Sequence, residues 1–280
     1  MATRLPPLLQ PYLAPPPANS LVLLSSVLGA STNWLVLRWI CSLLEGGHGD
    51  EMPEMGTESG TTVVLCSFLR EGGFWREGAG RMALNLNNDR FIFVDGLTAL
   101  CMPDTQLPEG KLPARDILLR GTAVEDVRKG LQSAIEQAAS RSDRVVLVLD
   151  QMDAWLAMAE AREVEVMDLL LSLREFFADK IVNARDQKVH STIVTVSADD
   201  PLLHAQTTTL EKEHAAFALS LAHEAYRIMA LRLLDTGTAL DVSGVVRITG
   251  GGKGNGGMAD AEFLYYVSGD GGVKVFERGA

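Results

Sequence analysis

Five short apolar runs, separated by helical or polar stretches, constrain the fold of this chain more than any other feature. They occupy residues 21–24, 61–68, 90–95, 144–150 and 191–197. Their lack of polar alternation is typical of strands that are buried on both faces. Helical patterns fall between them at residues 33–44, 74–86 and 121–140, and another follows the last run at residues 210–223. Between the fourth and fifth runs, apolar residues recur every three or four positions at Val166, Leu170, Leu173, Phe177 and Ile181. This alternation predicts an α/β fold, with a parallel sheet covered by helices on both faces.

The C-terminal part of the chain follows a different pattern. Four further strands, at residues 226–234, 242–249, 262–267 and 273–276, follow one another without helices between them. They predict an antiparallel extension of the same sheet. Residues 1–19 are rich in proline and predict an extended arm on the surface, while residues 20–280 predict one domain. The Gly-rich segment 46–60 and the Pro-rich segment 102–115 predict loops.

Charge and residue usage exclude several classes of function. The formal net charge is −11 over 280 residues, so the chain alone is a poor binder of nucleic acid, which requires clustered Lys and Arg. Three scattered cysteines and five histidines show no metal-ligand spacing, so we expect no metal and no cofactor. Residues 5–37 carry no charge, but Pro15-Pro16-Pro17 and the polar residues 31–33 interrupt the apolar stretch. We therefore expect no membrane span.

The turn after the first predicted strand is the place where a nucleotide-binding chain would carry a P-loop. The glycines of a P-loop bring backbone N–H groups to phosphate, its Lys reaches the outer phosphates, and its Ser or Thr holds magnesium. Here Gly29 remains, but Ser31 replaces the last glycine, Thr32 the lysine and Asn33 the magnesium ligand. No register can place a lysine in this turn, because the first lysine of the chain is Lys111. The turn is a degenerate P-loop, and a capped tight turn explains it.

Two other segments have partial nucleotide-site patterns. Asp150 ends an apolar strand in the way that a magnesium-binding Walker B aspartate does. Without a P-loop, a structural role is the simpler interpretation. The segment 250–257 (GGGKGNGG) contains Lys253, but glycine follows it where Ser or Thr is required. Strands flank this segment on both sides, so it predicts a flexible hairpin loop.

Several segments together resemble the family of the sixth subunit of the Elongator complex. They are residues 25–39 (SSVLGASTNWLVLRW), 67–86 (SFLREGGFWREGAGRMALNL), 90–100 (RFIFVDGLTAL) and 235–252 (DTGTALDVSGVVRITGGG). The resemblance runs from about residue 21 to the C-terminal strands. It implies a single RecA-like domain without a standard P-loop, and localisation to the cytoplasm and nucleus. It also implies a hexameric ring with the fourth and fifth subunits that binds tRNA and supports wobble-uridine modification of tRNA by the catalytic part of Elongator.

A comparison with related KaiC-like and RadA-like ATPases bears on catalysis. In those proteins the strand after the P-loop helix ends in catalytic carboxylates. Here Leu69 and Arg70 occupy the carboxylate places, and Glu71 comes one position late. The sequence therefore predicts a non-catalytic chain, a pseudo-ATPase. Two alternatives stay open: a divergent ATPase whose lysine is displaced, with Lys253 as the local candidate, and the related fifth Elongator subunit.

Two sets of residues are candidates for binding. Trp34 and Trp39 lie on different faces of a nearly uncharged helix, which predicts an exposed aromatic patch at a protein interface. The densest basic positions predict RNA contacts on loops: they are Arg70, Arg76, Arg81 and Lys253. Because the chain is acidic, we expect any affinity for tRNA to belong to the assembled ring.

Overall fold

One mixed sheet organises the protein, and the computed structural model describes residues 5–45, 60–102, 116–175, 189–234, 237, 239–254 and 260–278. The strand order is β10-β9-β8-β7-β1-β6-β5-β2-β3-β4. The parallel strands are β1 (Ser20–Ser26), β2 (Thr61–Ser67), β3 (Phe91–Asp95), β4 (Ile117–Leu118), β5 (Arg144–Asp150), β6 (Ser191–Ser197) and β7 (Arg227–Arg232). The antiparallel strands are β8 (Gly244–Gly250), β9 (Ala261–Val267) and β10 (Val273–Glu277). The predicted fold class is confirmed.

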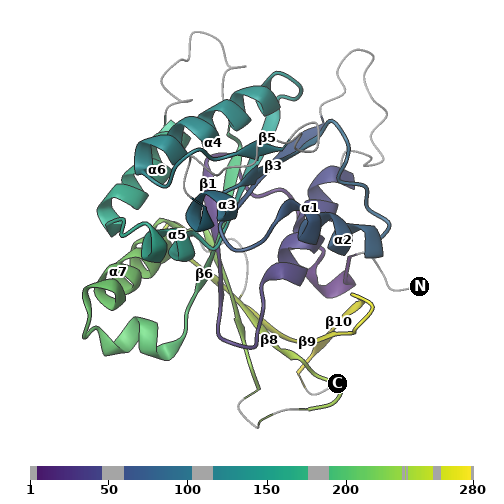
Figure 1. The fold of residues 1–280 in the computed structure, drawn as a ribbon. Coiled ribbons are helices and arrows are strands. Elements are labelled where there is room, and N and C mark those ends of the chain that lie inside the picture. Colours follow the sequence, from purple (N-terminus) through teal and green to yellow (C-terminus); the bar gives the residue numbers. More distant parts are fainter. Residues whose placement is uncertain are drawn as a thin grey trace.

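Helices cover both faces of the parallel part of the sheet (Figure 1). On one face lie α1 (Asn33–Glu45) and α2 (Gly72–Arg81), whose apolar side chains share one core with β1, β2 and β3. On the other face lie α4 (Val124–Ala139), α5 (Met152–Met158), α6 (Glu163–Glu175) and α7 (Thr209–Glu224), which form a second core. Burial on both faces explains why the central strands are continuously apolar.

The first of the four C-terminal strands differs from its prediction. β7 was expected to be antiparallel, but it pairs with β1 in parallel, with Val22 opposite Arg227. α7 precedes β7 and acts as the crossover helix that a parallel connection requires. The other three strands are antiparallel as predicted. Two short helices were not predicted, α5 and α3 (Leu97–Cys101), and a π-helical segment, Pro201–Ala205, precedes α7. α2 also ends earlier than predicted, before Ala83 adopts a left-handed φ of 55°.

The N-terminal segment is not an extended surface arm, so that prediction is wrong for residues 5–19. A short 3-10 helix, Pro7–Leu9, contacts β10, and Leu9 and Leu13 are fully buried. The ring of Tyr12 meets the ring of Phe263 edge-on at 6.0 Å. The segment therefore completes the core over the C-terminal strands. The predicted loops at 46–59 and 103–115, together with Phe177 and Ile181, lie outside the described residues.

Candidate functional site

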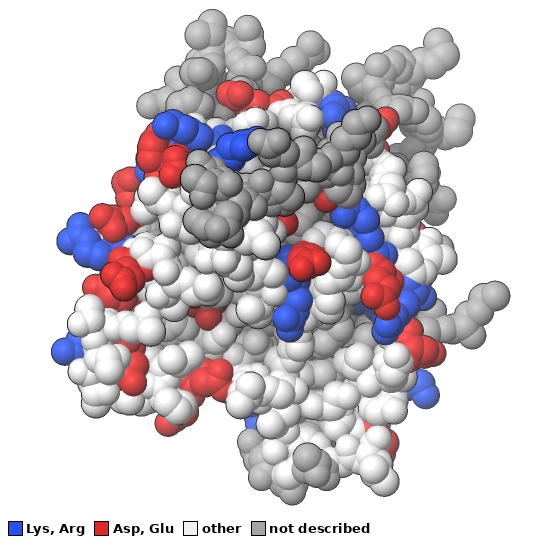
Figure 2. All heavy atoms as spheres, viewed as in Figure 1, with Lys and Arg blue, Asp and Glu red and all other residues white. Residues whose placement is uncertain are grey.

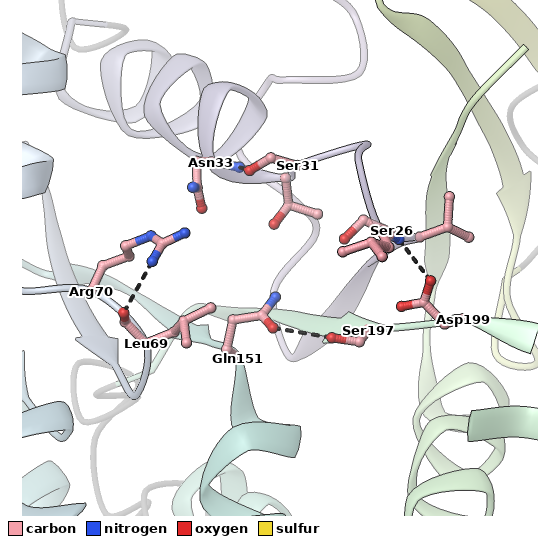
Figure 3. Close-up of a pocket in the computed structure, with 11 residues that line it drawn as sticks. Ser26, Ser31, Asn33, Leu69, Arg70, Gln151, Ser197 and Asp199 are labelled. Carbon is pink, nitrogen blue, oxygen red and sulfur yellow. Dashed lines mark hydrogen bonds between the residues drawn. The ribbon is translucent and has the colours of Figure 1, made fainter. Parts of the chain in front are cut away.

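A small cavity opens at the carboxyl edge of the parallel strands, in the turn between β1 and α1 (Figure 3). This edge is where open parallel sheets bind their ligands. The cavity has a volume of about 150 Å³. Its walls come from the β1–α1 turn and from the residues that follow β2, β5 and β6: Ser26, Val27, Leu28, Ser31, Thr32, Asn33, Leu69, Arg70, Gln151, Ser197 and Asp199.

The turn itself is short and closed by hydrogen bonds of its own backbone. Ala30 N–H donates to Val27 O at 2.9 Å, and Gly29 has the left-handed φ of 90° that glycine tolerates. Asn33 N–H donates to the Ser31 hydroxyl at 3.2 Å, which satisfies one free amide at the start of α1. Thr32 is 2% exposed, and its hydroxyl makes no hydrogen bond with any described residue. Of the degenerate P-loop residues, Ser31, Thr32 and Asn33 thus line the cavity, and Gly29 shapes the turn without lining it.

A carboxylate of the protein itself occupies part of this site. Asp199 follows β6, and its Oδ1 accepts a hydrogen bond from Leu28 N–H at 2.7 Å (Figure 3). In a P-loop, backbone N–H groups of this turn bind phosphate. Here one of them binds a fixed negative charge, which disfavours a second anion at the same amide. Sequence reasoning missed Asp199, although its position after a parallel strand was a usable signal.

Asp150 is fully buried at the end of β5 and does not line the cavity. Its two carboxylate oxygens accept hydrogen bonds from the hydroxyls of Ser67, at 2.8 Å, and Thr195, at 2.9 Å. Burial raises the pKa of Asp150 to about 6, and these hydrogen bonds oppose the rise only in part. Asp150 therefore ties together the ends of β2, β5 and β6.

The position of the catalytic carboxylates is filled by other residue types. Leu69 and Arg70 both line the cavity, and the exposed Glu71 does not. Arg70 N–H bonds to the Ser67 hydroxyl at 2.9 Å, which fixes the loop after β2. In this position the site carries a positive charge and an apolar side chain where a hydrolytic site requires a general base.

Comparisons with known proteins agree with this architecture. No family model and no curated protein matches the sequence. The fold is similar to that of the KaiC-like protein PH0186 from Pyrococcus horikoshii OT3, with a TM-score of 0.58, 14% identity, and coverage of 99% of this chain and 98% of that chain. It is also similar to the flagellar accessory protein FlaH from Methanocaldococcus jannaschii, with a TM-score of 0.56, 12% identity, and coverage of 92% and 90%.

This chain has the RecA-like fold. Within that fold, Lys253 cannot complete the cavity of its own chain. Gly250 pairs with Arg227 at the start of β7, and β7 runs parallel to β1, so Lys253 lies beyond the amino ends of these strands. The cavity lies at their carboxyl ends. Lys253 forms an ion pair with Glu224 at 2.6 Å instead.

The glycines around Lys253 serve close packing. Gly251 N–H donates to Tyr226 O, and a Cβ placed on Gly251 would lie 2.2 Å from Ala225 O. A Cβ placed on Gly252 would lie 2.4 Å from His223 O. The segment joins the antiparallel strands β8 and β9, as the predicted hairpin loop does, and its residues 251–254 pack against residues 222–226. Residues 255–257 lie outside the described part of the chain.

The four predicted RNA-contacting cations do not come together. Arg76 and Arg81 lie on α2 and not on a loop: Arg76 pairs with Asp116 and bonds to Asn87, and Arg81 pairs with Glu77 at 2.7 Å. Arg70 lines the cavity, and Lys253 lies at the opposite sheet edge. On the face seen in Figure 2, Lys and Arg side chains are interspersed with Asp and Glu, with no continuous basic surface among the residues shown in colour.

The predicted aromatic patch on the first helix is also absent from the described surface. Trp34 and Trp39 are 8% and 1% exposed. The ring of Trp34 packs on that of Tyr265 with centroids 4.8 Å apart, because the C-terminal strands extend beneath α1. The prediction that these tryptophans form an exposed interface is wrong for this chain.

A second buried carboxyl, Asp153, lies next to the site and was not predicted. Its Oδ2 accepts Ser197 N–H at 3.1 Å, while its Oδ1 has no partner among the described residues. Burial raises the pKa of Asp153, and the hydrogen bonds from Ser197 oppose the rise. Within the described ranges no three His, Cys, Asp or Glu side chains are grouped so that they could hold a metal. No described helix is long and apolar enough to span a membrane.

Proposed function

We propose that this chain is a non-catalytic RecA-like subunit of a tRNA-modifying assembly, corresponding to the sixth subunit of the Elongator complex. In this proposal it forms a hexameric ring with the fourth and fifth subunits. The ring binds tRNA and supports wobble-uridine modification by the catalytic part of the complex, in the cytoplasm and nucleus. The segments that resemble the family, at residues 25–39, 67–86 and 235–252, support the assignment to this subunit over the related fifth one.

One observation carries the non-catalytic part of the proposal. No lysine is found among the described residues that line the cavity at the P-loop position, and a carboxylate of the chain itself binds the Leu28 amide. Thr32 and Asn33 take the places of the phosphate-binding and magnesium-binding residues, and Leu69 and Arg70 take those of the general base. Each loss removes a contribution that phosphoryl transfer requires.

The test is a measurement of phosphate release by the purified chain with magnesium and ATP. We expect the rate to equal that of a buffer blank, and Asp150→Ala to leave it unchanged. The second candidate function, a divergent ATPase that obtains its lysine from another chain, predicts turnover in the assembly only. Magnesium-dependent turnover by the isolated chain that is lost in Asp150→Ala would refute the non-catalytic assignment.

A further inference from the structure

Exposed apolar side chains lie at the cavity and next to it: Leu28 and Leu69 line it, Phe74 lies beside Arg70, and Leu233 lies beside Gly29. Leu28 is 85% exposed, Leu69 and Phe74 are each 40% exposed, and Leu233 is 44% exposed. Leu233 reaches the turn at Gly29, where an added Cβ would lie 3.5 Å from its methyl groups. We call these four residues the apolar rim. Exposed apolar side chains that lie close together mark a surface that another protein covers.

The cavity is lined by an arginine that has no anionic partner within the described part of the chain. The guanidinium of Arg70 lies 5.3 Å from the ring centre of Phe74, which helps hold it in place. Its Nη1 makes one long hydrogen bond, 3.5 Å, to Leu69 O, and its Nε is buried without a partner. It forms no ion pair with any described carboxylate. The buried Asp150 attracts it only at a distance, and Asp199 lies across the cavity (Figure 3).

Two more groups favour an anion beside Arg70. The first turn of α1 contains no acidic residue, so the positive end of this 13-residue helix is not neutralised locally. The Thr32 hydroxyl, in a residue that is 2% exposed, lines the cavity without a hydrogen-bond partner. The hydroxyl is therefore free to form a hydrogen bond with a ligand in the cavity. Figure 3 shows Arg70 and Asn33, at the start of α1, on the opposite side of the cavity from Asp199.

The volume of the cavity and the charges around it indicate which kind of anion it can bind. Its volume of about 150 Å³ accepts one side chain, whereas small-molecule pockets usually measure about 300–1,000 Å³. Arg70 is the only Lys or Arg among the described lining residues, Asp199 also lines the cavity, and the exposed Glu71 follows Arg70 in the chain. Phosphate backbones require several cations close together. A carboxylate with apolar neighbours therefore fits better than a nucleotide or an RNA strand.

We propose that this cavity is a socket for a single Asp or Glu side chain of a different protein, whose apolar residues cover Leu28, Leu69, Phe74 and Leu233. Arg70, the Thr32 hydroxyl and the start of α1 bind the inserted carboxylate, and the apolar rim supplies the buried area. The inference builds on the proposed assembly function and identifies the chemistry by which a neighbouring subunit recognises this chain.

The first experiment places a photo-crosslinker, p-benzoylphenylalanine, at Leu28 of the full chain in its native cell. A matched control places it at Leu219, which is 60% exposed on α7. We expect the Leu28 adduct to map to a peptide of another protein that carries Asp or Glu beside apolar residues, and the Leu219 adduct not to map there. Adducts to RNA, to a second copy of this chain, or to a peptide without an acidic residue would each overturn the proposal.

The second experiment reverses the charge. The binding partner is the protein that the crosslink identifies, and its association with this chain is measured without the crosslinker. Arg70→Glu should weaken that association at least about tenfold, because a negative charge then faces the partner's carboxylate. Arg81→Glu on the exposed side of α2 is the control and should leave association within about twofold. Changing the mapped acidic residue of the partner to Arg should restore binding to Arg70→Glu.

A third variant guards against effects on folding. Leu28→Asp changes a side chain that is 85% exposed, so the fold should tolerate it, yet association should fall while Leu219→Asp has no effect. If a ring forms equally well with Arg70→Glu and Leu28→Asp, the socket is refuted and the proposed function stands. If no RecA-like ring exists but the adduct maps to an acidic peptide of another protein, the proposed function is refuted and the socket stands.

Discussion

Replacing Asp150 with Asn tests the structural role assigned to this buried carboxyl. The side chain is fully buried, accepts hydrogen bonds from Ser67 and Thr195, and does not reach the cavity. Asn keeps the shape and one acceptor oxygen but cannot ionise. The altered hydrogen bond lowers the free energy of unfolding by about 1 kcal/mol at every pH. The variant also loses the part of the stability that depends on the ionisation of Asp150, so the two effects can be measured separately.

The pH-dependent part follows from the pKa of Asp150 in the two states. Burial raises it to about 6 in the folded protein, whereas in the unfolded chain it is about 3.9. A difference of about 2 in pKa corresponds to ~3 kcal/mol. Asp150 therefore adds to the free energy of unfolding below about pH 4, where its carboxyl is protonated in both states. This added stability is lost as the pH rises through about 6, because the carboxyl of the unfolded chain ionises at a lower pH than that of the folded protein.

The assay is urea denaturation of wild type and Asp150→Asn between pH 4 and pH 7.5. We expect the wild type to lose ~3 kcal/mol relative to the variant across this range, with the change centred between about pH 4 and 6. Asp168→Asn, in a side chain that is 76% exposed, is the control and should give a profile parallel to wild type. A parallel profile for Asp150→Asn would refute the reasoning, as would stabilisation of the wild type by magnesium through Asp150.

Two further predictions concern local packing and capping, and a third concerns tRNA binding. Thr208→Ala removes the capping box at the start of α7 and should lower the free energy of unfolding by about 1 kcal/mol, measured by urea denaturation, while no loss would contradict that capping role. Gly251→Ala should destabilise by about 1–3 kcal/mol because its Cβ meets Ala225 O, whereas Gly250→Ala, with open space around it, should not. In gel-shift titrations at physiological salt, the isolated chain should not bind tRNA and the assembled ring should bind it more weakly as salt rises; salt-independent binding would contradict a phosphate-contact mode.

The sequence predicted the parts of the fold that depend on local patterns. Continuous apolar runs identified the central parallel strands, and the periodicity of Val166, Leu170 and Leu173 identified α6. β7 was assigned the wrong direction because proximity in sequence suggested a hairpin, while the helix before it carries the chain across the sheet. α5 is 7 residues long and begins after Gln151, whose φ of 56° no periodic pattern reveals.

The site was predicted in its location but not in its contacts. The turn around Gly29 and the strand end at Asp150 were identified, because P-loop and Walker B patterns are local. The hydrogen bond from Leu28 to Asp199 joins residues 171 positions apart. The position of Asp199 after a strand indicates the sheet edge, but it does not indicate which amide the carboxylate binds. The same holds for Trp34, whose cover, Tyr265, comes from a distant strand.

Native mass spectrometry of the complex purified through this chain from its native cell tests the central claim most directly. The account predicts a hexamer that contains two other kinds of RecA-like chain, the fourth and fifth Elongator subunits. A monodisperse monomer, or an assembly made of this chain alone, would contradict it.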